Sequence, residues 1–393
     1  MTAGSLHALE DMLVEGRAAA VERERTTFDR LAGSRGEQLV FFGAGGLGRR
    51  MLGACRLAGV EPLAFADNQE KLWNAEVDGV RVLSPFEAAD RYGSDATFVV
   101  TIWGALGHDR MHDRVRQLRD LGCASAVPFL PLAWKHPDRM LPHYGAHLPH
   151  RVYDAVDDVT ACYWLWADDA SRREYVDQIR WRLLGDFDGL PAPTKQPIYF
   201  PRDLCAPRSD ETFVDCGAFD GDTVRLFLRE AGSFRKIYAF EPDPVNFDRL
   251  QASFEELGGA GDDDVHALPY ATGARRETLR FNATGSAMSA LGAGDIEVQA
   301  VALDDVLCEE APTFIKMDIE GGEPEALAGA IRIIREHEPV LAISCYHRQE
   351  HLWQIPLQIR AISPNYRLFL RPHDLEMWDL VCYAVPVSRL AAT

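Results

Sequence analysis

Short apolar runs alternate with stretches of helical spacing along most of the chain, and this order predicts an α/β fold. The first 30 residues are rich in Glu, Arg and Ala and predict a helix. Strands are expected in the first half at 38–42, 62–67, 80–83 and 97–103, with helices at 49–57, 85–92 and 109–121. Strands are expected in the second half at 212–216, 236–243, 265–271, 313–318, 339–347, 367–370 and 380–384, the last antiparallel, with a hairpin-like insertion through 279–282 and 296–299.

The middle of the chain interrupts this pattern. Prolines at 137, 142 and 149 argue against regular helix between 136 and 150. From 155 to 184 helical spacing returns, and Trp164, Tyr175, Ile179 and Leu183 are expected to pack in a core. The predicted organisation is an N-terminal helix at 1–36, a Rossmann-like domain at 37–130, a helical and Pro-rich connector at 131–207, and a second Rossmann-like domain at 208–393.

Composition narrows the class of protein. The chain has 393 residues, 47% hydrophobic and 26% charged, which is typical of soluble globular proteins. A net charge of −19 without a basic run argues against nucleic acid as a partner. No window holds about 18 consecutive apolar residues, so no membrane span is expected. Eight scattered cysteines without a C-x-x-C pair favour buried free thiols and a cytoplasmic location.

The first domain carries a glycine fingerprint. Gly43, Gly45 and Gly48 follow a predicted strand and open a predicted helix, and Asp67 ends the next strand. Glycines at these places let a backbone approach a pyrophosphate, and the acid suits a ribose. Nucleotide or sugar-nucleotide binding is one interpretation. The other is that the glycines only allow the helix to pack closely on the strand.

A second turn with glycines and acids follows the strand at 212–216. Gly217 and Gly221 permit close approach of a ligand, and Asp215 and Asp220 are expected to face a cationic group. Capping of the following helix is the alternative use of these acids. Glu241 ends the next strand, where a carboxylate offers two acceptor oxygens to a diol.

Four ordered motifs, at 213–223, 238–244, 303–307 and 315–323, resemble the FkbM-type methyltransferase family. The resemblance runs from about 197 to 386. It implies a seven-stranded class I methyltransferase sheet in the second domain, and S-adenosylmethionine as cofactor, with Glu241 on the ribose hydroxyls. The cofactor contacts that it implies are Asp215, Gly217, Ala218, Asp220, Thr223, Glu241 and Asp318, with adenine near Tyr270 and Ala271.

Catalysis requires activation of a hydroxyl, which is a poor nucleophile when neutral. The resemblance places Asp318 at the transferring methyl, and His347 ends the neighbouring strand, where its imidazole is suited to act as general base. Alternatively, Asp318, Glu320 and His347 hold a divalent ion such as Mg²⁺. A third interpretation is structural, with Glu320 as a helix cap and His347 bonded in the core.

The function expected from the sequence is O-methylation of a small-molecule metabolite, such as a sugar or a glycosylated or polyketide-like natural product. One alternative is a sugar-nucleotide oxidoreductase or isomerase that uses the first domain. Another is a non-catalytic S-adenosylmethionine-binding protein. The expected partner is a small-molecule substrate, and a homo-oligomer is compatible with the sequence.

Overall fold

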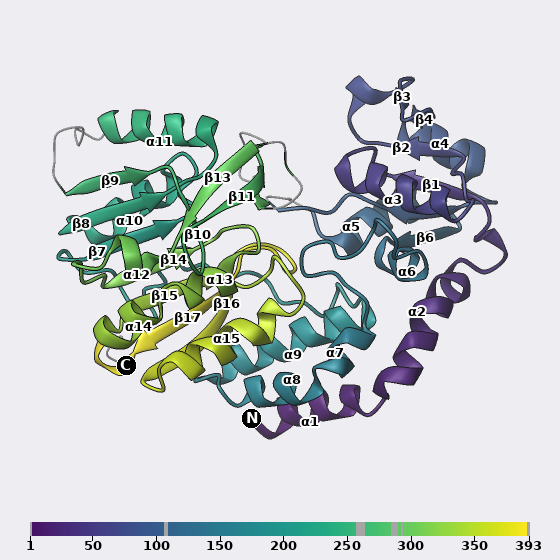
Figure 1. Cartoon of the computed structure of the whole chain (residues 1–393). Coiled ribbons are helices and arrows are strands. Elements are labelled where there is room, and N and C mark those ends of the chain that lie inside the picture. Colours follow the sequence, from purple (N-terminus) through teal and green to yellow (C-terminus); the bar gives the residue numbers. More distant parts are fainter. Residues whose placement is uncertain are drawn as a thin grey trace. The chain divides into compact units, whose positions relative to one another are not determined.

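The computed structural model describes residues 2–105, 109–256, 264–283, 290–291, 294 and 296–390. The chain forms two compact units, each assembled from three segments (Figure 1). The first comprises Met1–Asp157, Arg173–Ala192 and Asp374–Trp378, and the second comprises Asp158–Arg172, Pro193–His373 and Asp379–Thr393. The predicted connector at 131–207 is therefore divided between the two units.

The N-terminal segment forms two helices where one was expected. They are α1 (Thr2–Leu13) and α2 (Gly16–Ala32). Gly16 adopts a φ of 77°, which no helix interior accommodates, so the chain changes direction there. A short 3₁₀ turn, Gly33–Arg35, leads from α2 toward the first strand.

The first unit contains a six-stranded sheet in the order β3-β4-β2-β1-β5-β6. Its strands are β1 (Leu39–Phe42), β2 (Ala64–Ala66), β3 (Glu76–Val77), β4 (Val80–Leu83), β5 (Thr97–Val100) and β6 (Ser125–Pro128). All neighbours are parallel except β3 and β4. Strands β3 and β6 were not predicted. Strand β3 has only two residues, which is too short for a pattern, and β6 has the sequence Ser-Ala-Val-Pro, which does not alternate between apolar and polar residues.

Helices between these strands agree closely with the prediction. They are α3 (Gly46–Leu57), α4 (Pro85–Tyr92) and α5 (Met111–Asp120), with a 3₁₀ turn at Glu70–Leu72. The start of α4 shows why the local sequence is informative. The Ser84 side chain accepts a hydrogen bond from the Glu87 N–H at 3.1 Å, and Pro85 occupies the first turn, where its missing N–H costs nothing.

In the middle of the chain one helix was not predicted and one expectation is wrong. Helix α6 (Leu130–Lys135) forms just before the Pro-rich stretch, with Pro131 in its first turn. Trp164 is 61% exposed, since it follows the end of α8 rather than lying within a continuous helix, whereas Tyr175, Ile179 and Leu183 are buried as predicted. The helices of this region are α7 (His150–Asp154), α8 (Val156–Tyr163) and α9 (Asp169–Leu184).

The second unit contains a seven-stranded sheet in the order β16-β17-β15-β14-β7-β8-β9. Its strands are β7 (Thr212–Cys216), β8 (Lys236–Phe240), β9 (Val265–Leu268), β14 (Phe314–Met317), β15 (Val340–Ser344), β16 (Tyr366–Pro372) and β17 (Leu380–Pro386). Strand β17 is antiparallel to both its neighbours, and the other pairs are parallel. The carboxyl ends of β7, β8, β14 and β15 therefore lie at one edge of the sheet.

Helices follow most of these strands and bury an aromatic core. They are α10 (Asp222–Ala231), α11 (Pro244–Glu256), α12 (Leu303–Val306), α13 (Glu323–Ala328), α14 (Ile331–His337) and α15 (His351–Ile362), with a final 3₁₀ turn at Val387–Arg389. Phe213 of β7 stacks on Phe227 of α10 with ring centroids 4.5 Å apart. Phe200 and Phe314 join the same cluster, which fixes α10 against the strand that precedes the glycine turn.

The predicted insertion forms a small separate sheet in the order β10-β13-β11-β12. Its strands are β10 (Ala271–Thr272), β11 (Glu277–Asn282), β12 (Ala290–Leu291) and β13 (Ile296–Val301). Strands β11 and β13 pair antiparallel, which confirms the hairpin character of the insertion. The strand expected at 265–271 is divided, because after Leu268 the chain leaves the large sheet and enters this one.

Cysteine and helix properties complete the comparison with the sequence. All eight cysteines are free thiols, and all are buried except Cys308. Among the described helices, none combines the length and the apolar character that crossing a membrane requires.

Candidate functional site

The glycine turn after β7 is fixed between its two neighbouring strands. The N–H groups of Gly217 and Ala218 both donate to the Phe240 carbonyl of β8 at 3.0 Å. Gly217 has a φ of 82°, and a Cβ atom there would lie 2.0 Å from the Asp318 carbonyl oxygen after β14. Only glycine fits at this position, because the turn packs directly against the backbone that follows β14.

Asp215 lies beneath this turn with no exposed surface and forms an ion pair with a buried lysine. The distance from Lys316 Nζ to Asp215 Oδ1 is 2.9 Å. The two residues are paired in register across β7 and β14, so their side chains share one face of the sheet. Burial raises the pKa of Asp215 to about 6, although Lys316 opposes this effect. Lys316 was not among the predicted site residues.

Glu241 is held at the end of β8 by backbone donors. Its Oε2 accepts a hydrogen bond from the Phe219 N–H at 2.9 Å, and its Oε1 accepts one from the Asp243 N–H at 2.8 Å. Burial raises the pKa of Glu241 to about 7, against the opposing effect of these two bonds. Each carboxylate oxygen has lone pairs for a further donor, so the group is oriented and still able to bind a diol.

The remaining predicted cofactor residues of the turn differ in their surroundings. Asp220 pairs with Arg225, with 2.7 Å between Oδ1 and the guanidinium, and its side chain is 35% exposed. Helix α10 begins after Gly221 without a side-chain cap, so capping does not account for Asp220. Ala218 is buried in the glycine turn, and Thr223 is buried in the first turn of α10.

Tyr270 and Ala271 lie beside Glu241. The Leu268 carbonyl accepts hydrogen bonds from both the Glu241 N–H, at 3.0 Å, and the Tyr270 N–H, at 2.8 Å. The Arg276 guanidinium lies 6.0 Å from the centre of the half-buried Tyr270 ring, and Ala271 is buried. The residues expected near adenine and the residue expected at ribose are thus brought together.

Asp318 lies at the end of β14 between a phenol and an imidazole. The Tyr199 hydroxyl donates to Asp318 Oδ2 at 2.8 Å, and His347 Nε2 lies 3.3 Å from Asp318 Oδ1. The backbone N–H of Tyr199 donates to the Tyr383 hydroxyl at 2.9 Å. Tyr199 lies 119 residues before Asp318 in the sequence, so no local spacing pairs these two residues.

Three carboxylates surround His347. Its Nδ1 lies 2.8 Å from Glu323 Oε1, and its Nε2 lies 3.7 Å from Glu320 Oε1 as well as near Asp318. Burial opposes a charge on this ring, but the carboxylates outweigh it and raise the pKa of His347 to about 10. An imidazolium has no lone pair to accept a proton, so this arrangement does not favour His347 as general base.

The cluster also changes the predicted metal site. Ligand atoms of Asp318, Glu323 and His347 lie within 4.8 Å of one another, so Glu323 takes the place expected for Glu320. Glu323 Oε1 already accepts hydrogen bonds from the Ile319 N–H at 3.0 Å and the Gly321 N–H at 3.4 Å. A proton on His347 balances part of the negative charge, so the arrangement does not require a cation.

The N-terminal fingerprint has a clear packing role. A Cβ atom at Gly48 would lie 1.9 Å from the Gly43 carbonyl oxygen, whereas none of the described atoms lies within 4 Å of the Cβ position at Gly45. Asp67 is buried, and its Oδ2 accepts a hydrogen bond from the Ala44 N–H at 2.8 Å. Close packing of α3 on β1 thus explains Gly48, and nucleotide binding here stays a prediction.

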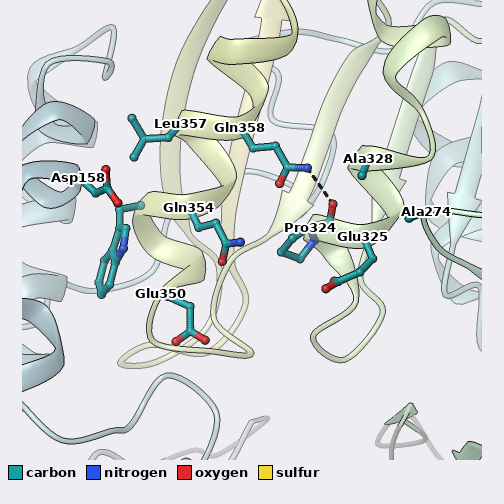
Figure 2. A pocket seen from close by; sticks show the side chains of 10 residues that line it. Asp158, Ala274, Pro324, Glu325, Ala328, Glu350, Gln354, Leu357 and Gln358 are labelled. Atoms are coloured by element: carbon teal, nitrogen blue, oxygen red, sulfur yellow. Dashed lines mark hydrogen bonds between the residues drawn. The ribbon is translucent and has the colours of Figure 1, made fainter. Parts of the chain in front are cut away.

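A pocket of about 700 Å³ opens beside α13 and α15 in the second unit (Figure 2). Carboxylates and amides form about half of its lining and apolar side chains the other half. The Gln358 amide donates to the Pro324 carbonyl at 2.8 Å. Pro324 directly follows Glu323, and the lining residue Glu350 directly precedes His351. The lining residues are Asp158, Ala274, Pro324, Glu325, Ala328, Glu350, Trp353, Gln354, Leu357 and Gln358.

Three signals in the sequence pointed to the residues that were missed. A lysine inside the apolar strand at 314–317 is unusual unless it is paired, and strand alternation places it on the same face as Asp318. Glu323 ends the motif at 315–323. Tyr199 belongs to a Pro-flanked aromatic segment that is typical of a loop covering a site. None of these signals identified a partner.

Comparison with known proteins agrees with this geometry. A family model described as the methyltransferase FkbM domain matches residues 215–377. The crystal structure of methyltransferase FkbM from Methylobacillus flagellatus KT is 22% identical, with a TM-score of 0.76 over 98% of this chain and 99% of that one. A comparison with curated proteins finds no match.

More remote structures match less than half of this chain. A precorrin-6y C5,15-methyltransferase from Geobacter metallireducens GS-15 is 10% identical, with a TM-score of 0.29 over 45% of this chain and 79% of that one. The Methanococcus jannaschii fibrillarin pre-rRNA processing protein is 12% identical, with a TM-score of 0.31 over 48% and 76%. The predicted α/β fold is confirmed by the strands and helices observed, and the family match confirms the resemblance. Residues 215–377 are therefore similar to the methyltransferase FkbM domain, as the sequence motifs indicated.

Proposed function

We propose that the second unit is an S-adenosylmethionine-dependent methyltransferase that acts on a hydroxyl group of a small-molecule metabolite. The observation that carries this proposal is the oriented carboxylate of Glu241 beside the glycine turn. A buried acid held by two backbone N–H groups, next to a turn that only glycine can form, is suited to a nucleoside. The family match at 215–377 supports the same reaction.

In this proposal, different residues bind different parts of the cofactor. Glu241 would accept hydrogen bonds from the ribose hydroxyls, and the loop at Tyr270 and Ala271 would lie along the adenine. The turn from Gly217 to Gly221 would hold the amino-acid end. When bound, S-adenosylmethionine supplies an electrophilic methyl group. The protein's own contribution is to align the acceptor oxygen with that group and to receive its proton.

The carboxylates at the end of β14 are better placed to receive this proton than His347. Asp318 is oriented by Tyr199 and His347, and its side chain is 25% exposed. Burial raises the pKa of Glu320 to about 7, close to the value that suits a general base at neutral pH. In this proposal His347 stays protonated and stabilises the charge on Asp318.

The pocket beside α13 and α15 supports a polar acceptor. Its carboxylates and amides offer hydrogen bonds to hydroxyl groups, whereas a purely apolar substrate would leave them without partners. Sugars and glycosylated or polyketide-like natural products have the required density of hydroxyl groups. The net charge of −19 does not suit nucleic acid as the acceptor.

Binding of the cofactor product tests the proposal first. S-Adenosylhomocysteine should bind the wild-type chain in calorimetry, and Glu241→Gln should weaken binding roughly tenfold or more, because one amide N–H₂ would face a backbone donor. Glu310→Gln is the matched control, since Glu310 pairs with Lys236 at the opposite end of β8. Equal affinities of Glu241→Gln and wild type would contradict the assignment of Glu241.

Turnover is tested with labelled S-adenosylmethionine and a panel of sugar nucleotides and glycosylated metabolites, with and without a chelator. Label should reach a hydroxyl group in either condition. Transfer abolished by the chelator would restore the metal interpretation of Asp318 and His347. Tight binding without transfer to any acceptor would favour a non-catalytic protein. Reduction of a nicotinamide cofactor would favour an oxidoreductase of the first unit.

A further inference from the structure

Lys316 is a charged side chain in the interior of the seven-stranded sheet. Its side chain is 2% exposed, and its neighbours along β14 are apolar. Burying an ammonium is strongly unfavourable unless it is paired, and an apolar residue of similar volume usually stabilises a protein as well or better. Stability alone therefore gives little reason for a lysine at this position.

The contacts of the ammonium converge on a single segment of chain. Nζ lies 2.9 Å from Asp215 Oδ1, 2.6 Å from the Gly217 carbonyl oxygen and 3.3 Å from the Cys216 carbonyl oxygen. The two carbonyl groups accept hydrogen bonds and the Asp215 carboxylate forms an ion pair, so all these contacts lie at the end of β7 and the start of the glycine turn. Burial opposes a charge on Lys316, but Asp215 and the neighbouring carboxylates outweigh it and raise the pKa of Lys316, so the group stays charged.

The same ammonium also lies against the residue that orients Asp318. Nζ is 5.4 Å from the centre of the Tyr199 ring, within the range of a cation–π contact. Tyr199 has a φ of 64°, uncommon for an aromatic residue, and donates its hydroxyl to Asp318. One side chain thus contacts both the turn at Gly217 and the support of Asp318.

We propose that Lys316 is a positioning residue that fixes the turn at Gly217 for the amino-acid end of S-adenosylmethionine. The inference rests on the proposed function. Lys316 acts through the carbonyl groups of Cys216 and Gly217 and through the Asp215 carboxylate. The ribose and the adenine depend less on Lys316, because Glu241 also accepts a hydrogen bond from the Asp243 N–H outside the turn and the Tyr270 N–H donates to the Leu268 carbonyl.

Two probes separate these parts of the ligand. S-Adenosylhomocysteine has an amino-acid end, whereas 5′-methylthioadenosine keeps the ribose and adenine and lacks it. Calorimetry with Lys316→Met should show S-adenosylhomocysteine weakened roughly tenfold to a hundredfold, as expected for lost charged hydrogen bonds. Binding of 5′-methylthioadenosine should change less than about threefold, a difference below about 0.7 kcal/mol.

Two further variants allow for misfolding of the single variant and control for the loss of an ion pair. Lys316→Met leaves the buried Asp215 carboxylate without its cation, so the double variant D215N/K316M removes both charges and is measured if the single variant does not fold. It should show the same selective loss of S-adenosylhomocysteine. Lys236→Met is the matched control, since it breaks an ion pair with Glu310 at the amino end of β8 and should leave both affinities unchanged.

The outcomes are distinct. A selective loss of S-adenosylhomocysteine supports the inference. Equal weakening of both probes would overturn it and leave Lys316 a purely structural residue, and unchanged binding of both would overturn it as well. Failure of the wild-type chain to bind either probe would instead refute the proposed function on which the inference rests.

Discussion

His347 and its carboxylates show how strongly a site depends on the partners of each group. Glu323, fully buried, pairs with both His347 and His351, and these contacts hold the pKa of Glu323 well below its usual range despite burial. Glu320 lies farther from the same ring and has the opposite shift, because burial dominates there. Two glutamates three residues apart thus have different charges near neutral pH.

Glu320→Gln tests this difference through stability. The pKa of Glu320 is about 7 in the folded state, above its unfolded value of about 4.5. Ionisation of Glu320 therefore does not affect the free energy of unfolding below about pH 4.5, and it lowers that free energy increasingly as the pH rises to about 7. Glutamine does not ionise, so the variant should be more stable than wild type at pH 8, by about 1–2 kcal/mol after allowance for partial exposure, and less so at pH 5.

Urea denaturation at pH 5 and pH 8 measures this change. Glu325→Gln is the control and should show no such pH dependence, because Glu325 is an exposed residue of α13, five positions after Glu320. A Glu320→Gln variant that is less stable than wild type at pH 8 would show that the carboxylate stabilises the site instead.

The two glycine turns differ at the scale of elements. In both, a strand runs into a turn and then a helix, and an acid at the end of the next strand accepts an N–H from the turn: Asp67 from Ala44 and Glu241 from Phe219. In the second unit a buried ammonium at Lys316 and the cluster at Asp318 lie beside the turn as well. Both turns therefore share the same strand-turn-helix arrangement, and the additional charged groups distinguish the second turn from the first.

Substitution of the N-terminal glycines checks their packing role. Gly48→Ala should destabilise the first unit by about 1–3 kcal/mol, because its Cβ would overlap the Gly43 carbonyl and press on Phe65. Gly45→Ala should be close to neutral, since its backbone is extended with a φ of −76° and open space surrounds the Cβ position. Thermal unfolding compares the two, and equal stability would contradict the packing account.

At the scale of the whole molecule, the first unit is built from segments far apart in the sequence. Trp103 Nε1 donates to Glu376 Oε2 at 2.5 Å, and the Met111 N–H donates to Glu376 Oε1 at 2.7 Å. The Trp103 ring also lies 5.7 Å from Trp181 and 4.8 Å from Trp378, measured between centroids. Residues 173–192 and 374–378 thus complete an aromatic core that residues 1–157 begin.

A fragment of residues 1–157 should therefore not fold cooperatively, because it leaves Trp103 and its aromatic neighbours exposed. Circular dichroism during heating should show no sharp transition for this fragment. A fragment of residues 1–192 restores Trp181 but not Glu376, and should be intermediate between the short fragment and the full chain. A cooperative transition in the 1–157 fragment would contradict the three-segment description.

The sequence alone determined the repeating strands and helices, the two glycine turns, and the acids at 215, 241 and 318. It could do so because apolar periodicity, glycine and helix-start signals act over a few residues and need no distant partner. The same local reasoning missed the helix at 130–135 and misjudged Trp164, where the exact end of a helix decides whether a residue is buried.

Only the tertiary structure decided how these groups are paired. Lys316 meets Asp215 because two parallel strands are in register, and Tyr199 meets Asp318 across 119 residues. The charge on His347 depends on three carboxylates from the loop after β14 and the start of α13. The spacing of these residues in the sequence does not show which of them lies nearest to the imidazole. Burial and partners set the pKa of a group, and both exist only once the chain has folded.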